Sequence, residues 1–341
     1  MNDDERRSRA AILSAYQRIS LQECLVDGCQ SKDRVIRAHS IQRAEVLETI
    51  ALDGHVYMPI QQATGLTLRR VGINRATCFS GFCAEHDNSL FYSIDLGPDD
   101  LLDLDDPEVI VRLSLRSVAR EYWAKLNSVR IYRRLFDLGK SGRVEEIQSF
   151  LDISESSARH LIAHADDNIR PLLEGSSTAA ARIGRLFGSL MHQLSSGDFH
   201  YSKYWTHTFF SNPSVAVSSH FPIEFDLTGK QITSRKRGVD LAEATLNIVP
   251  RDSCTQLAFL WHRRFEKTLG RFFKQLEETP EVELKLRLSQ MLIMHCENFA
   301  IAPRFYESKS EREQETILTL FRETLNAAMP YQELPEVSLL I

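Results

Sequence analysis

The sequence lacks the long hydrophobic runs, the signal-like start and the dense cysteines that mark membrane or exported proteins. No stretch reaches the uninterrupted apolar length that a membrane span needs. Residues 1–7 are highly charged, and no apolar signal core follows them. Six cysteines in 341 residues do not make a disulfide scaffold, and a reducing compartment favours metal binding by such cysteines. These absences predict a cytoplasmic protein with no membrane partner.

An excess of positive charge is also missing. The formal net charge is −5, so binding to nucleic acid would need a local basic patch. The chain shows no internal repeat or low-complexity tract, and its large C-terminal part has no phosphate loop and no nucleophile elbow. What remains is an ordinary globular balance, 43% hydrophobic and 26% charged, with a length that allows two domains.

Two pairs of metal-ligating residue types stand close together in the N-terminal part of the chain. Cys24 and Cys29 form the first pair, and Cys83 and His86 form the second. Thiolate and imidazole are the ligands that Zn²⁺ prefers, and two such pairs complete a tetrahedral site. Gly28 suits a chain reversal between the first two sulfurs, because glycine adopts positive φ easily. The spacing therefore predicts a structural zinc ion bound by these four residues.

Ordinary burial is the alternative role for these cysteines, since free cysteine is often buried. Two knuckle-spaced pairs favour the metal site over that alternative. Cys78 is a rival fourth ligand, but the tighter spacing of Cys83 and His86 makes Cys78 a packing residue. Residues 35–39 have strand character, and residues 87–89 suit the start of a short helix over residues 90–94. A knuckle, strands and a second ligand pair at a helix start describe a treble clef.

The remainder of the chain predicts an α+β fold, in which a small zinc-bound module precedes a larger, mostly helical domain with a β-rich insert. Helices are expected over residues 5–20, 44–50, 107–138, 262–278, 281–298 and 309–328. After residue 138, helices are expected to continue to about residue 193, with breaks near residues 142, 154 and 175–177. Strands are expected over residues 55–58, 67–71, 204–210, 214–218, 221–227, 246–249 and 256–261. The acidic, proline-bounded segment 96–107 predicts a boundary. We therefore expect a zinc module with an N-terminal helix over 1–97, a helical region over 107–199, and an α+β region over 200–341 that ends in three helices.

The order of polar residues in the first quarter of the chain resembles that of zinc-stabilised HNH endonucleases of the ββα-metal class. The residues that carry the resemblance are Cys24, Cys29, His39, Asn74, Cys83, His86 and Asp87, within about residues 20–95. The resemblance implies a treble clef that hydrolyses phosphodiester bonds in DNA or RNA. It implies that His39 is the general base, that Asn74 orients the base loop, and that Asp87 binds a catalytic Mg²⁺ or Mn²⁺. Histidine titrates near neutral pH and carboxylate binds hard cations, so both assignments suit the chemistry.

The chain departs from the HNH pattern at two positions. Ala38 stands where the family usually has a second metal ligand, and Asp87 replaces the final histidine. The alternative function is therefore a non-catalytic zinc module for protein or nucleic-acid recognition. The segments 37–42, 54–57 and 81–87 also resemble a group of uncharacterised bacterial proteins, an association that suggests antiphage defence.

Four further features have both a functional and an ordinary explanation. Residues 144–161 resemble a helix-turn-helix, although a plain helix pair is favoured. His160 and His164 share a helix face without an evident third ligand. The basic cluster 234–238 suits phosphate contacts, and the aromatic stretch 199–210 suits base stacking or a core. The C-terminal region is in addition a candidate surface for another protein.

Overall fold

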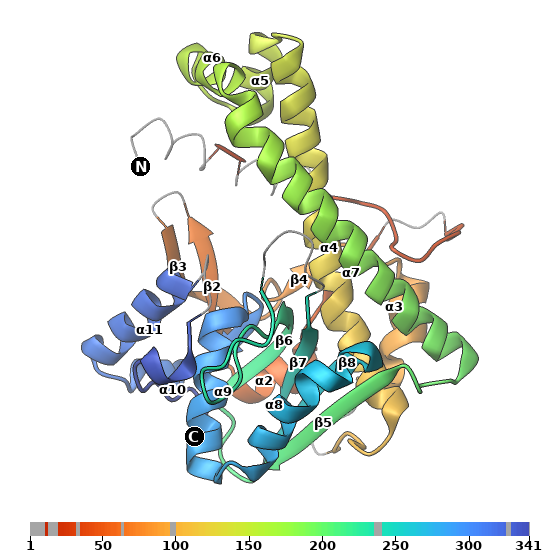
Figure 1. Ribbon diagram of the computed structural model, residues 1–341, viewed down its shortest axis with the longest axis vertical. Helices are drawn as coiled ribbons and strands as arrows, with labels where there is room; N and C mark the ends of the chain where they lie inside the picture. The colour runs from red at the N-terminus through yellow and green to blue at the C-terminus, as the bar shows by residue number, and fades with distance from the viewer. Residues whose placement is uncertain are drawn as a thin grey trace.

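The computed structural model describes residues 11–12, 20–31, 35–62, 65–95, 100–234, 241–324 and 329–340 (Figure 1). Helices and strands both contribute large parts of these residues, so the predicted α+β class is confirmed. Most of the predicted N-terminal helix, part of the predicted boundary and the basic cluster beyond Ser234 lie outside the described residues.

Seven strands form an antiparallel sheet in the order β3-β2-β9-β6-β7-β8-β5. Its strands are β2 (His55–Gln62), β3 (Gly65–Gly72), β5 (Ser202–Phe209), β6 (Val215–Pro222), β7 (Glu243–Pro250), β8 (Thr255–His262) and β9 (Phe299–Ile301). β1 (Ala38–His39) and β4 (Cys78–Phe79) form a separate antiparallel pair. The hairpin β2-β3 reaches the rest of the sheet through β9, because Tyr57 pairs with Ile301. The predicted division into three parts stays a prediction, and this sheet joins strands from the first and the third.

Helices cover both faces of the sheet (Figure 1). Their bounds are α2 (Glu48–Ile50), α3 (Ala84–Phe91), α4 (Pro107–Lys140), α5 (Val144–Leu151), α6 (Glu155–Ala163), α7 (Arg170–Ser196), α8 (Glu266–Glu278), α9 (Glu281–His295), α10 (Pro303–Glu307) and α11 (Glu311–Thr324). Short π-helical turns occupy Arg43–Leu47 and Ala165–Ile169, and 3₁₀ turns occupy Tyr92–Ile94, Arg263–Phe265 and Tyr331–Glu333. One apolar core holds α8, α9 and α11 against the sheet, and a second core holds α4 and α7 against the opposite face.

The long helix α4 links the parts of the molecule. It begins with Pro107 at its first turn, where a missing N–H costs nothing, and the Asp106 side chain accepts the backbone N–H of Glu108. Its first half packs on the sheet, and its second half extends beyond the sheet with α5 and α6 around a third, smaller core (Figure 1). The result is a helical arm that projects from the sheet, made of the end of α4, α5, α6 and the start of α7.

Several predicted elements are confirmed with shifted ends, and three differ in kind. The expected break at residues 175–177 is wrong, because α7 runs through it: Ile183 and Phe187 are buried against the sheet core, and tertiary packing outweighs weak local propensity. The expected strand 221–227 ends at Pro222, since Asp226 instead organises a turn by accepting the backbone N–H groups of Thr228 and Lys230. Beyond residue 295, the final helices are separated by β9 and α10, which the sequence pattern missed.

The start of α3 also differs from the prediction. The helix begins at Ala84 rather than near residue 90, and Cys83 is its N-cap residue. The backbone N–H of Asp87 donates to the Cys83 carbonyl, which closes the first turn at the second ligand pair. The predicted capping residues 87–89 therefore lie inside the helix, and Cys83 is the N-cap residue in their place.

Candidate metal centre

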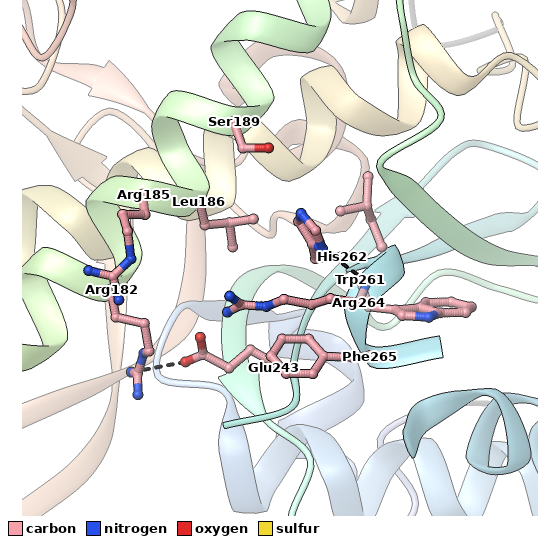
Figure 2. A pocket seen from close by; sticks show the side chains of 10 residues that line it. Arg182, Arg185, Leu186, Ser189, Glu243, Trp261, His262, Arg264 and Phe265 are labelled. Atoms are coloured by element: carbon pink, nitrogen blue, oxygen red, sulfur yellow. Dashed lines mark hydrogen bonds and ion pairs between the residues drawn. The ribbon is translucent and has the colours of Figure 1, made fainter. Parts of the chain in front are cut away.

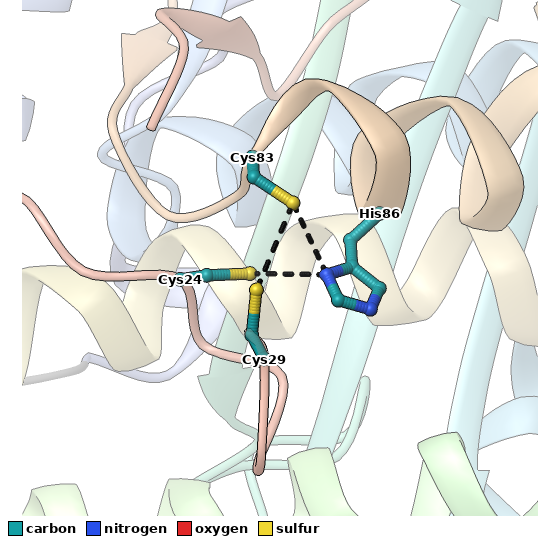
Figure 3. Close-up of side chains that lie close together, drawn as sticks. All are labelled: Cys24, Cys29, Cys83 and His86. Atoms are coloured by element: carbon teal, nitrogen blue, oxygen red, sulfur yellow. Dashed lines mark hydrogen bonds between the residues drawn. The ribbon is translucent and has the colours of Figure 1, made fainter. Parts of the chain in front are cut away.

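Cys24, Cys29, Cys83 and His86 converge in space (Figure 3). One ligand atom from each lies within 4.8 Å of the others. The Cys83 sulfur is 3.2 Å from His86 Nδ1 and 3.9 Å from the Cys29 sulfur, and the Cys24 sulfur is 3.5 Å from His86 Nδ1. A sulfur separation of 3.9 Å excludes a disulfide, whose bond is about 2.05 Å long. The four predicted ligands therefore form one group that is close enough to hold a metal ion.

The separations suit a tetrahedral ion. With metal–sulfur and metal–nitrogen bonds of about 2.3 and 2.05 Å, tetrahedral geometry places two sulfurs about 3.8 Å apart and a sulfur and a nitrogen about 3.6 Å apart. The observed sulfur–sulfur distance of 3.9 Å and the sulfur–nitrogen distances of 3.2 and 3.5 Å are close to these values. The donor set of three thiolates and one imidazole is also a common structural zinc set.

Backbone hydrogen bonds hold the two ligand-bearing loops together. The N–H of Leu25 donates to the Gly81 carbonyl at 2.8 Å, and the N–H of Ile36 donates to the Phe82 carbonyl at 2.9 Å. Gly28 has φ of +72°, as the expected turn requires. Gly81 is required for a steric reason instead, because a Cβ at this position would lie 2.6 Å from a ring carbon of Phe79. The backbone thus sets the ligand positions before any metal bond is considered.

The protein environment gives the Cys24 and Cys83 thiols different pKa values. Burial raises the pKa of the Cys24 thiol to about 11. Burial also acts to raise the pKa of Cys83, but hydrogen bonds from the backbone and side chain of His86 outweigh it and lower that pKa to about 7. Cys83 also stands at the N-terminus of α3, where thiolate character is favoured. A proton must therefore leave Cys24 when metal binds.

Cys78, the rival ligand, lies outside this group. Its sulfur is 3.4 Å from His39 Nε2 and 3.6 Å from the Asn74 carbonyl oxygen. In the antiparallel pair β1-β4, Cys78 on β4 lies directly opposite His39 on β1. Cys78 therefore contacts the predicted base, a role that the sequence spacing did not suggest.

His39 is half-buried at the end of β1. Its Nε2 lies 3.1 Å from the Ile73 carbonyl, which can only accept, so the ring proton is on Nε2 and Nδ1 is the basic nitrogen. Burial lowers the pKa of His39, and the positive charges of Arg43, Arg116 and Arg37 lower it further, in opposition to the Ile73 carbonyl. The imidazole is thus neutral near pH 7, the form that accepts a proton.

The other residues that the HNH resemblance selected occupy different surroundings. Asn74 is exposed, and its side-chain oxygen accepts a hydrogen bond of 2.8 Å from Arg43. Asp87 is half-buried in the first turn of α3, and burial raises the pKa of its carboxyl group while the charge of Arg116 opposes this shift. Ala38 is 3% exposed and offers no ligand. Among the described residues, the group of Cys24 and its three partners is the one set of three or more clustered metal-ligand side chains.

Arg116 on α4 is a charged residue beside this region that sequence reasoning missed. It is buried, makes two hydrogen bonds of 2.7 and 2.8 Å to Asp95, and lies 4.3 Å over the Phe91 ring. Its charge lowers the pKa of both His39 and Asp87, so it is within electrostatic reach of both. No local pattern marks it, because its partners come from a segment more than twenty residues away in the sequence.

The ligand loops pack directly on α4. The Trp123 indole N–H donates to the Leu21 carbonyl at 3.2 Å, and the Leu21 N–H donates to the Asn127 side chain. Phe79 contacts the Trp123 ring edge-on, with centroids 6.1 Å apart. The metal centre therefore shares its hydrophobic core with α4 and the sheet.

The remaining sequence features show ordinary structural contacts. The helix pair predicted over residues 144–161 is confirmed as α5 and α6, and Arg159, its basic residue, pairs with Glu155 at 2.6 Å. The rings of His160 and His164 lie 4.6 Å apart on α6 and its end. Trp205 packs against the sheet core beside Phe259, whereas Tyr201 and Tyr204 are partly exposed.

Comparisons with protein-family models, with curated proteins and with solved structures find no match to this chain. In the part of the chain that the structure describes, no helix is both long and apolar enough to cross a membrane.

Proposed function

We propose that Cys24, Cys29, Cys83 and His86 bind a structural Zn²⁺, and that residues 20–95 form a treble-clef module of HNH type. The proposed activity is hydrolysis of phosphodiester bonds in DNA or RNA, in a setting such as bacterial defence. Support for zinc comes from the donor set and the near-tetrahedral separations. Support for the HNH type comes from the order β1, β4, α3, in which an antiparallel strand pair precedes a helix with Cys83 at its N-cap and His86 in its first turn.

One observation carries the catalytic proposal: the hydrogen bond between His39 Nε2 and the Ile73 carbonyl. It fixes the tautomer and orientation of the ring, and it leaves Nδ1 to take a proton from an attacking water. The lowered pKa keeps that nitrogen unprotonated at neutral pH. These are the properties that a general base requires, and they arise from residues that the resemblance did not name.

Asp87 is the proposed ligand for a catalytic Mg²⁺ or Mn²⁺, which supplies charge stabilisation at the leaving oxygen. Mg²⁺ is often held by one or two carboxylates together with substrate phosphates. Ala38 contributes no ligand, so Asp87 and the substrate would share that task. Arg116 is close enough to compete electrostatically with a cation for Asp87.

The test is cleavage of plasmid DNA and of RNA by the wild type and by His39→Ala, with Mg²⁺ or Mn²⁺. We expect cutting by the wild type and its loss in the variant, at unchanged zinc content. His55→Ala is a matched control, because His55 is an exposed histidine on β2 that also bonds a carbonyl. Because the pKa of His39 is lowered, the rate should be constant above about pH 6.5 and fall below it as the base is protonated. Equal cutting by wild type and His39→Ala contradicts the assignment.

A non-catalytic recognition module is the second candidate. It is favoured by the buried Ala38 and by the hydrogen bond that occupies the Asn74 side-chain oxygen. On this proposal, zinc stabilises the loops as a scaffold and the wild type cuts neither substrate. Binding of labelled DNA or RNA without cleavage would then identify a nucleic-acid scaffold.

A further inference from the structure

The strand β5 is one border of the seven-stranded sheet and lies at the lower margin of the molecule in Figure 1. It pairs with β8 along its whole length, and it pairs with no other strand among the described residues. Where β8 ends, Trp261 and His262 line a small cavity together with Leu186 and Ser189 of α7, so a helix covers this inner neighbour of β5 (Figure 2). The sheet therefore stops at the outer side of β5, where an added strand would extend it.

The hydrogen bonds at the start of β5 show which of its backbone groups point outward. The N–H of Arg263 donates to the Tyr201 carbonyl at 2.7 Å, and these residues lie opposite each other when the β5-β8 register is continued by one residue. In an antiparallel pair, such hydrogen-bonded positions alternate with positions whose N–H and C=O groups point away from the partner. The backbone groups of Tyr204, Thr206 and Thr208 therefore point away from β8. Within the described part of the chain, no other element bonds to them.

The opposite border of the sheet is protected in ways that β5 is not. On β3, the Leu66 carbonyl accepts a hydrogen bond of 3.1 Å from Arg322 Nε of α11, and Arg69 and Arg70 are exposed charged residues of the strand. Helix cover and charged side chains are common means by which proteins prevent pairing at sheet edges. β5 is eight residues long, contains no proline or glycine, and has Lys203 as its single lysine, arginine or carboxylate residue. It is therefore a long edge that another strand can join.

Exposed aromatic side chains gather along the same strand. Phe210, the residue after β5, is 84% exposed, and Tyr201 and Tyr204 are 43% and 37% exposed. Among the described residues, Tyr92 is the one other large aromatic side chain that is exposed to this degree. Aromatic residues are enriched in protein–protein interfaces, and exposed apolar groups that lie together mark interaction sites. The aromatic residues therefore indicate that the edge of β5 is a contact surface.

We propose that β5 of a second copy of this chain pairs antiparallel with this edge, about a two-fold axis at Thr206. A register that sets Thr206 opposite Thr206 of the second copy also sets Tyr204 opposite Thr208. It is the register that matches all three outward-pointing residues with one another, and each of the three pairs exchanges two hydrogen bonds. The contact is the same on both copies, so it closes as a dimer with one continuous sheet.

The side chains of the strand fit this register. Trp205 lies opposite His207 of the second copy, and these two rings already stack within one copy, with planes 3° apart. Opposed threonines at position 206 are a favourable cross-strand pair. Lys203, the charged residue of the strand, lies opposite Phe209, so the two strands set no like charges against each other.

The exposed aromatic residues are covered in the same arrangement. Phe210 comes opposite Ser202 of the second copy and diagonal to its Tyr204, within reach of an aromatic side chain. The two-fold axis repeats this contact at the other end of the paired strands. The match of the strand with itself, in backbone groups, charge and aromatic residues, is the reason that the occupant is a second copy rather than an unrelated peptide.

The experiment measures the mass of the purified full chain by analytical ultracentrifugation over about 1–100 µM, and we expect a wild-type species of twice the chain mass. Thr206→Lys sets two lysines against each other, and Thr206→Pro removes an outward N–H. Each should weaken the dimer at least about tenfold. Proline is tolerated on an edge strand where its N–H would face solvent, so the Thr206→Pro chain should stay folded, which circular dichroism checks. Thr319→Lys, at an exposed threonine on α11, should keep the dimer.

Cross-linking tests the register. In Thr206→Cys, the two introduced sulfurs face each other across the axis, where opposed Cα atoms are about 5.5 Å apart and within reach of a disulfide. This variant should form a disulfide-linked dimer under mild oxidation. Lys203→Cys, which would face Phe209, should not, and the wild type on the same non-reducing gel accounts for the native cysteines.

Two results overturn the proposal. A wild type that stays monomeric to about 100 µM excludes the second copy and leaves the edge to an extended peptide of another protein. A dimer that both Thr206→Lys and Thr206→Pro leave intact is formed by a different surface. No residue of β5 belongs to the metal centre, so His39→Ala should keep the dimer whether or not the chain cleaves nucleic acid.

Discussion

Replacing Cys83 by serine should release the metal and unfold the ligand loops. Cys83 is 1% exposed, its sulfur is within 3.9 Å of both Cys29 Sγ and His86 Nδ1, and its carbonyl begins α3. A serine hydroxyl is a poor substitute for a thiolate at a zinc site, because zinc prefers a deprotonated sulfur donor. The change removes one of four ligands from the centre of the cluster.

The expected loss is large compared with the stability of the module. Structural zinc contributes about 10–16 kcal/mol of apparent binding free energy in small metal-dependent domains. A whole domain is stable by only about 5–15 kcal/mol. The sheet with α8, α9 and α11 has a core of its own, and so does the helical arm, so both should stay folded. We therefore expect local unfolding of residues 20–31 and 78–91 and persistence of the remainder.

Zinc content and hydrogen exchange followed by mass spectrometry measure both parts of this prediction. Cys83→Ser should purify with less than about a tenth of the wild-type zinc and should lose amide protection in the two ligand loops. Cys78→Ser is the matched control, since Cys78 is in the same module and contacts His39 rather than the cluster. Full zinc content and unchanged protection in Cys83→Ser would refute the reasoning, as would equal loss of zinc in the control.

Two further predictions concern the metal-free thiols and the packing of the ligand loops. The pKa values of about 11 for Cys24 and about 7 for Cys83 mean that protons compete with metal, so affinity should fall at least about tenfold per pH unit on acidification below pH 7. A competition titration with a zinc indicator checks this, and an affinity independent of pH would contradict it. Gly81→Ala should cost about 1–3 kcal/mol, because its Cβ would lie 2.6 Å from the Phe79 ring. Gly175→Ala, where a Cβ meets nothing within 4 Å, should be neutral or stabilising in the same thermal melt.

The four residues that cluster at the candidate metal centre could be identified from the sequence because their signal is local. Two short pairs, each within one turn, need only one tertiary contact to become a four-residue site. The positive φ of Gly28 was likewise predictable, because the turn between Cys24 and Cys29 itself requires it. The amphipathic patterns of α4 and α8 were readable for the same reason, because helix periodicity repeats within a few residues.

Predictions failed where distant contacts overrode local preference. The Gly-Ser segment 175–177 reads as a break, yet α7 continues through it because the helix packs along α4 and the sheet. The strand β9 has only three residues, too few for a visible alternation, and exists because β2 and β6 both pair with it. Short elements of this kind are stabilised by their neighbours, which the local sequence does not contain.

The sequence by itself determined which four side chains would cluster, the turn at Gly28 and the α+β class, because each depends on patterns that repeat within a few residues. Tertiary structure alone decided the surroundings of the functional groups. It gave His39 its Ile73 partner and placed Arg116 near both His39 and Asp87. The physical reason is that pKa values and binding cavities depend on charges and donors within a few ångströms in space, whereas those groups lie tens of residues apart in the chain.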